Sequence, residues 1–181
     1  MKKEFALPEY ITANEIRETR KALKLSQDEF AELLGCSKPT VVRWENSKEN
    51  ITGPIAAAIY LLKRSDCALK LVLPEMKYGL RLKYMYRQYL CTLIDVDEMN
   101  ETVEIVNYTN KIMFCAFGSE ANPSYADYKE FLESRCFPRT RDKMKLVLKE
   151  IGVPFYDPMM IIEKTKGRMA EDDFWIEVVR K

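Results

Sequence analysis

Apolar residues recur every three or four positions from residue 26 to residue 46, and this spacing predicts two short amphipathic helices. The first helix begins at a capping box, in which the side chains of Ser26 and Glu29 bond to each other's backbone amides. Three apolar residues form its inner face: Phe30, Leu33 and Leu34. Gly35 can adopt the positive φ that ends a helix, so we expect a tight turn before the second helix.

The second predicted helix combines an apolar face with polar side chains that point elsewhere. Ser37 can cap this helix, and the missing amide of Pro39 costs nothing in the first turn. Val41 and Trp44 lie three positions apart and give the helix its apolar face. Three polar residues remain free to meet a partner: Lys38, Thr40 and Arg43.

Two more helices are predicted on either side of this pair. Upstream, Thr12 and Glu15 form a second capping box, and three apolar anchors follow: Ile16, Leu23 and Leu25. Downstream, a glycine-proline pair opens a helix with three apolar residues on one side: Ile55, Ile59 and Leu62. Residues 1–73 are therefore predicted to form an all-α helix-turn-helix bundle. The alanines at 56–58 suit either close packing against a second copy or ordinary core packing.

The pattern changes beyond a boundary at residues 73–79, where Pro74 and Gly79 interrupt a segment otherwise suited to a helix. Three strands are predicted after it, at residues 80–94, 102–108 and 112–117, with a hairpin turn at 109–111. Residues 80–94 also interleave basic residues with tyrosines, which is compatible with nucleic-acid binding, but the alternation favours one half-buried strand.

Helical spacing returns in the last third of the chain. A helix is predicted from Ser124, and another at residues 140–151, closed by Gly152. The chain is thus expected to be α+β: an N-terminal helix-turn-helix bundle followed by a small α+β domain with an antiparallel sheet. We expect this second domain, residues 80–181, to serve partner binding or dimerisation.

Composition narrows the functional classes. The chain has 181 residues, 47% of them hydrophobic. It contains no apolar run long enough to span a bilayer and no charged leader followed by an apolar segment. We therefore expect a soluble cytoplasmic protein without membrane contact. It has no histidine, and its five cysteines are scattered without a CxxC pair. We therefore expect no metal, no other cofactor and no enzymatic activity.

Residues 12–66 resemble the Cro and phage-repressor (XRE) helix-turn-helix family in SQDEFAELLG, in the CSKPT turn and in VVRWEN. The resemblance implies sequence-specific binding to double-stranded DNA by a homodimer, on a palindromic operator. It further implies a transcriptional repressor that acts on its own promoter. The net charge of the whole chain is only +1, so specificity is expected to depend on two recognition helices about one DNA turn apart.

The same resemblance assigns roles to individual residues. The family position matching Gln27 contacts phosphate and braces the recognition helix, and the positions matching Arg20 and Glu45 form a structural ion pair. Three residues match positions that contact base edges: Lys38, Pro39 and Arg43. Pro39 departs from the family pattern because its side chain has no donor.

Arg43 is the strongest candidate for base recognition. A guanidinium can bond to both O6 and N7 of guanine in the major groove, which gives about 1–3 kcal/mol of discrimination. Lys38 and Thr40 lie near the helix N-terminus, where phosphate is also favoured, so they either position the helix or specify bases. Three residues are candidates for DNA-backbone contacts, or equally for an ordinary cap and turn: Ser37, Asn46 and Lys48.

Two further resemblances point to toxin-antitoxin systems. The run TVVRWENS is similar to MqsA-type and HipB-like antitoxins, although the chain lacks the cysteine-rich zinc-binding portion of the former. Residues 135–181 resemble the small N-terminal element of HipA-like kinase toxins, with an arginine-rich helix start and a DFWI finish. Together, these two resemblances imply an antitoxin whose C-terminal domain docks on a cognate toxin protein. The alternatives are an accessory dimerisation domain, or a protein-interaction module that binds and restrains a partner protein.

Overall fold

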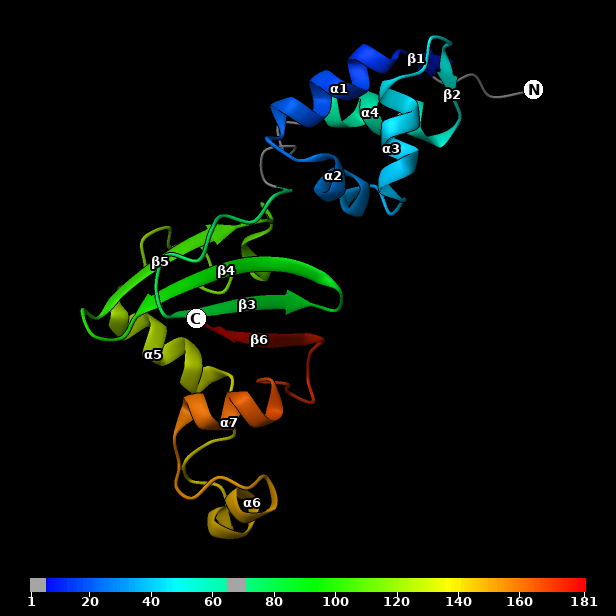
Figure 1. Cartoon of the computed structure of the whole chain (residues 1–181). Coiled ribbons are helices and arrows are strands. Elements are labelled where there is room, and N and C mark those ends of the chain that lie inside the picture. Colours follow the sequence, from blue (N-terminus) through cyan, green and yellow to red (C-terminus); the bar gives the residue numbers. More distant parts are fainter. Residues whose placement is uncertain (1–5, 65–70) are drawn as a thin grey trace. The chain divides into compact units, whose positions relative to one another are not determined.

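The computed structural model describes residues 6–64 and 71–181, which belong to two compact units, Met1–Pro74 and Glu75–Lys181 (Figure 1). Unit 1 is helical and unit 2 contains a four-stranded antiparallel sheet. This confirms the predicted α+β class. Within the described ranges, none of the helices is both long and apolar enough to cross a membrane.

The described residues of unit 1 form four helices and one very short sheet. The helices are α1 (Ala13–Ala22), α2 (Gln27–Leu33), α3 (Lys38–Glu45) and α4 (Pro54–Arg64). The short sheet pairs β1 (Tyr10–Ile11) with β2 (Ile51–Thr52) in antiparallel register. Two-residue strands carry no periodicity, so the sequence did not predict this sheet.

Capping and one glycine define the helix ends of unit 1. Both predicted capping boxes are present, with Thr12 before α1 and Ser26 before α2. Gly35 has a φ of +63° just after α2, a conformation that favours glycine. Four side chains at the centre of the unit are completely buried: Ile16, Phe30, Val41 and Ile59. The apolar positions of α1, α2, α3 and α4 therefore meet in one core.

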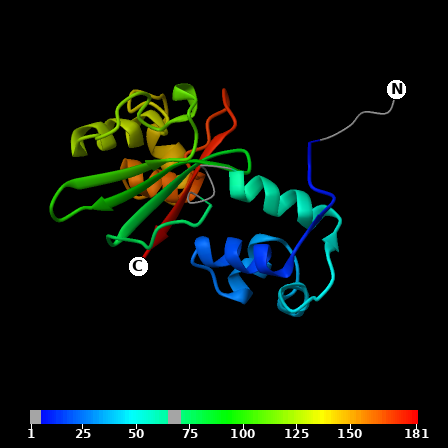
Figure 2. The same cartoon turned by 90° about the horizontal axis from the view of Figure 1, so that it is seen from above.

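Unit 2 is a sheet with strand order β5-β4-β3-β6, and every neighbouring pair is antiparallel. Its strands are β3 (Leu80–Tyr86), β4 (Tyr89–Asp97), β5 (Thr102–Asn107) and β6 (Phe174–Arg180). Its helices are the 3-10 turn η2 (Ile112–Phe114), α5 (Tyr125–Ser134), α6 (Met144–Glu150) and α7 (Pro158–Thr165). Figures 1 and 2 show α5 and α7 on one face of the sheet.

The core of unit 2 lies between this sheet face and the helices. Alternate residues of β3, including Leu80, Leu82 and Tyr84, point into it. From the helices, Phe131 and Ile162 pack into the same cluster. On β3, Arg81 falls between the core positions and forms a buried ion pair with its neighbour Asp95 on β4, Nε to Oδ1 2.5 Å.

Several sequence predictions for unit 2 are wrong. Residues 80–94 are not one strand, because the chain reverses at Arg87, whose φ is +54°, and Tyr86 pairs with Tyr89 across the turn. Residues 112–117 are not a strand: they begin with η2, and the expected hairpin turn at 109–111 is absent because no strand follows it. Apolar runs this short do not distinguish a strand from a turn that covers a core.

One prediction for the last third of the chain also needs correction. The helix expected at 140–151 starts only at Met144, because Lys143 has a φ of +58° that α-helical backbone does not permit. No element is predicted from the sequence at residues 174–180, which form β6 and pair with β3 along its whole length. The predicted helix after Ser124 is present as α5, with a capping box between Ser124 and Asp127.

We expect the substitution Ile176→Ala to destabilise unit 2 by about 2–5 kcal/mol, since Ile176 is 1% exposed and its loss leaves a cavity between β6 and the helices. Urea denaturation followed by fluorescence and circular dichroism measures the change. Glu177→Ala is the matched control on the same strand, because Glu177 is exposed and forms only a surface ion pair with Lys83. Equal effects of the two substitutions would mean that β6 is not part of the core.

Candidate nucleic-acid interface

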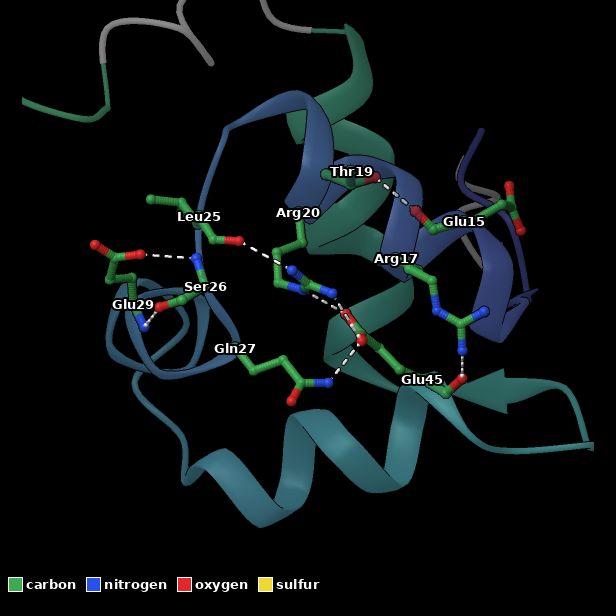
Figure 3. A network of polar contacts seen from close by, with 9 residues as sticks. All are labelled: Glu15, Arg17, Thr19, Arg20, Leu25, Ser26, Gln27, Glu29 and Glu45. Carbon is green, nitrogen blue, oxygen red and sulfur yellow. Dashed lines mark hydrogen bonds and ion pairs between the residues drawn. The ribbon is translucent and has the colours of Figure 1, made fainter.

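The carboxylate of Glu45, at the end of α3, joins three helices (Figure 3). Glu45 is 3% exposed. From α1, Arg20 donates to it through Nε (to Oε1, 2.6 Å) and Nη2 (to Oε2, 3.1 Å). From α2, Gln27 donates through Nε2 to Oε2 at 2.8 Å. The arginine-carboxylate pair is bidentate, the strongest geometry for such a contact, so the end of α3 is held in register with α1 and α2.

Two further arginine contacts extend this network along the backbone. Arg17 lies one turn before Arg20 on α1, and its Nη2 donates to the backbone carbonyl of Glu45 at 2.5 Å. Arg20 also donates through Nη1 to the carbonyl of Leu25, which precedes α2, at 3.0 Å. Cations at a helix C-terminus complement its partial negative charge, so both arginines stabilise the end of α3.

The pKa values of Glu45 and Arg20 both shift in the direction expected for an ion pair. The hydrogen bonds from Arg20 are the largest influence on Glu45 and lower its pKa below the ordinary value, against the opposing effect of burial; Gln27 lowers it further. The hydrogen bond to Glu45 is likewise the largest influence on Arg20 and raises its pKa. Both groups are therefore ionised throughout the neutral range.

The side of α3 away from the core carries the residues expected to meet DNA. Lys38, Pro39 and Arg43 are exposed, and Thr40 is half-buried. Across residues 6–64 and 71–181, the guanidinium of Arg43 has no hydrogen bond or ion pair. The best candidate for base contact is thus presented on a fixed helix with its donors available.

On this outer side of α3, the residues at the start of the helix have partners within the protein, unlike Arg43. Lys38 Nζ lies 2.7 Å from Asp28 Oδ2 on α2, and both side chains are more than half exposed. Ser37 occupies the N-cap position but makes no side-chain capping bond, because its hydroxyl lies 2.9 Å from the hydroxyl of Thr40. Lys38 and Thr40 therefore have protein partners that any phosphate would have to replace.

The remaining candidate residues lie on α2 and at or just beyond the end of α3. Gln27 is half-buried and its amide nitrogen is directed to Glu45, so of its two expected roles the structure contains the bracing contact. Asn46 is the C-cap of α3, and Lys48 is exposed in the turn that follows. All of these candidates belong to unit 1 and surround α3.

Sequence reasoning overlooked two participants, Arg17 and Asp28. Arg17 lies three positions before Arg20 and so on the same helix face, a spacing that could have indicated a second contact to α3. Asp28 lies ten positions before Lys38, on another helix, and no local pattern connects them.

We expect Glu45→Gln to destabilise unit 1 by about 3 kcal/mol at neutral pH, because it leaves Arg20 in a half-buried site without a counter-charge. The folded pKa of Glu45 is depressed, so its contribution is complete above the unfolded pKa of about 4.3 and is lost as the pH falls through the folded pKa. The difference between wild type and variant should therefore shrink below about pH 4.

Urea denaturation at neutral pH and in acid measures both effects. Glu49→Gln is the control, because Glu49 is exposed a few residues beyond α3 and its substitution should change stability by less than about 0.5 kcal/mol. A difference between wild type and Glu45→Gln that stays constant down to acid pH would contradict a role for the ionised carboxylate.

A comparison with known protein families finds a match in the same region of the chain. Residues 16–59 match the family model described as helix-turn-helix, which covers most of α1, all of α2 and α3, and the first half of α4. No curated protein matches the chain. Residues 16–59 thus form a helix-turn-helix domain of the XRE type, a DNA-binding regulatory domain, with α3 as the second helix of its motif.

Proposed function

We propose that this protein is a sequence-specific DNA-binding transcriptional regulator that inserts α3 into the major groove. One observation carries the proposal: the inner side of α3 is locked by Glu45, while Arg43 on its exposed side has no partner among the described residues. A fixed helix with free donors is what base recognition in the major groove requires. The helix-turn-helix match over residues 16–59 supports the same assignment.

In this proposal the candidate residues divide into three groups: those that face the bases, those that contact the DNA backbone and the ion pair that supports α3. Arg43 contacts guanine, and Pro39 contributes only apolar surface. Lys38, Thr40 and Gln27 contact phosphate near the two helix N-termini, where backbone amides also favour anions. Three residues are assigned to further DNA-backbone contacts: Ser37, Asn46 and Lys48. The ion pair of Arg20 and Glu45 supports α3 from inside.

We further propose that the protein acts as a homodimer on a palindromic operator in its own promoter. Its net charge of +1 gives little non-specific attraction to DNA, so a single recognition helix would bind weakly. On α4, Leu61 is 60% exposed beside the half-buried alanines Ala57 and Ala58, which supports this helix as the contact between copies.

The more specific form of the proposal is an antitoxin whose unit 2 binds a cognate toxin protein. The segment that resembles the HipA-like element spans α6, α7 and β6 of unit 2. The alternative function, a module that restrains a partner protein without DNA binding, draws on exposed apolar side chains at Leu146 and Phe155, 56% and 61% exposed. Co-purification with the product of a neighbouring gene, without selective DNA binding, would favour this alternative.

We expect Arg43→Ala to abolish operator selectivity and to leave weak, salt-sensitive binding, with a loss of about 1–3 kcal/mol on the operator only. The measurement is a titration of labelled duplex from the protein's own upstream region, and of a scrambled duplex, at near-physiological salt. Lys21→Ala is the control, because Lys21 is an exposed cation on α1. Equal weakening on both duplexes would make Arg43 a phosphate contact, and no selectivity in the wild type would contradict the proposed function.

We expect Asp28→Asn to strengthen DNA binding about two- to fivefold on all sequences, because it removes an anion beside α3 and frees Lys38 for phosphate. The exchange is favourable because an exposed ion pair contributes at most about 1 kcal/mol. The same titration at two salt concentrations tests it, with Glu18→Gln on α1 as the control for a change in net charge. Identical gains for both variants would show that Lys38 has no particular role.

A further inference from the structure

A hollow of about 400 Å³ opens in unit 2 at the end of the sheet where β3 turns into β4 and where β5 ends. Its wall is formed by the two ends of the β3-β4 turn and by the segment that runs from β5 into η2. Sites for small molecules in proteins have volumes of about 300–1,000 Å³. The hollow therefore has room for a molecule of one or two rings.

Aromatic rings dominate this wall. Four of its residues are aromatic: Tyr86, Tyr89, Tyr108 and Phe114. Tyr86 and Phe114 meet edge to face, with ring centroids 4.7 Å apart and planes at 87°. Tyr89 is 63% exposed, which is unusual for so large an apolar ring in a strand. A planar aromatic guest can stack on such rings, whereas a non-planar aliphatic guest makes only part of these contacts.

The wall has one charged side chain, and it is a cation. The ammonium of Lys111 lies 5.7 Å from the ring centroid of Phe114, and in the described part of the chain it has no ion pair. Burial raises the pKa of the Cys91 thiol and of the Tyr108 phenol, so both stay neutral at physiological pH. The hydroxyls of the tyrosines add donors without adding charge. The hollow thus combines aromatic surface with a single positive charge.

We propose that this hollow binds a small planar aromatic carboxylate, with its ring system against Tyr86, Tyr89 and Phe114 and its carboxylate at Lys111. A cationic guest would be repelled by Lys111, which already lies over the face of Phe114. An aliphatic acid would pair with Lys111 but would lose the ring contacts. The site lies wholly within unit 2, so the proposal does not depend on DNA binding by unit 1.

The test is calorimetric titration of the full chain with 1-naphthoate, with backbone amide NMR shifts to locate the site. We expect saturable one-to-one binding, with shifts concentrated at residues 86–91 and 108–114. The neutral amide of the same ring and cyclohexanecarboxylate should each bind roughly tenfold more weakly, since each lacks one of the two contacts.

Two variants make the test specific. Lys111→Met should weaken 1-naphthoate about tenfold while leaving the neutral amide unchanged, and Tyr89→Ala should weaken both about threefold to tenfold. The matched controls are Lys145→Met, an exposed lysine elsewhere in unit 2, and Tyr10→Ala, an exposed tyrosine of unit 1; neither should change binding. Tyr89 and Lys111 are exposed, so both variants should retain the wild-type circular dichroism spectrum.

Four results would overturn the proposal. Three are the absence of binding at millimolar 1-naphthoate, equal affinity for the acid and its amide, and unchanged binding in both variants. The fourth is a set of NMR shifts confined to unit 1, which would place the ligand elsewhere.

Discussion

The arrangement of unit 1 depends on the buried carboxylate of Glu45. A carboxylate that is 3% exposed is costly to bury unless donors and an opposite charge surround it. Arg20 and Gln27 supply these donors from two other helices, and Arg17 bonds to the carbonyl of the same residue. The positions of α1, α2 and α3 are therefore correlated, because a shift of any one of them would take away at least one hydrogen bond to the carboxylate of Glu45. Burial of the apolar core holds the helices together, and the hydrogen bonds to Glu45 set the rotation of each helix about its own axis.

As a consequence, some of the eight residues of α3 hold the helix in place and others remain available for contacts with a partner. Val41 and Glu45 face inward, where one packs in the core and the other closes the polar network. Lys38 and Arg43 face outward, where Lys38 makes only an exposed ion pair with Asp28 and Arg43 has no partner among the described residues. Because support and recognition use different side chains, changes on the outer face can alter what α3 recognises without loss of the fold. This separation is what allows one scaffold to present different sets of contacts.

The sequence predicted unit 1 well because its signals are local. Capping residues such as Ser26 lie within four positions of the groups that they satisfy, and Gly35 marks its own turn. Unit 2 was predicted less well because its sheet depends on distant contacts. The turn at Arg87 has a positive φ without glycine or asparagine, and β6 pairs with a strand about ninety residues earlier. Among the candidate site residues, the sequence identified the exposed positions on α3, but the ion pair of Lys38 with Asp28 required the packing of two helices.

The distribution of charge in unit 1 sets how selective the proposed DNA binding must be. Arg17 and Arg20 bond to Glu45 at the end of α3, and Lys38 forms an ion pair with Asp28. Few cations near α3 are left to neutralise phosphates, so the release of counterions contributes little to affinity on any sequence. In the proposed dimer, contacts to base edges and the simultaneous binding of two copies would then supply most of the free energy. The proposed regulator would dissociate readily from random DNA and remain bound only where the operator engages both recognition helices at once.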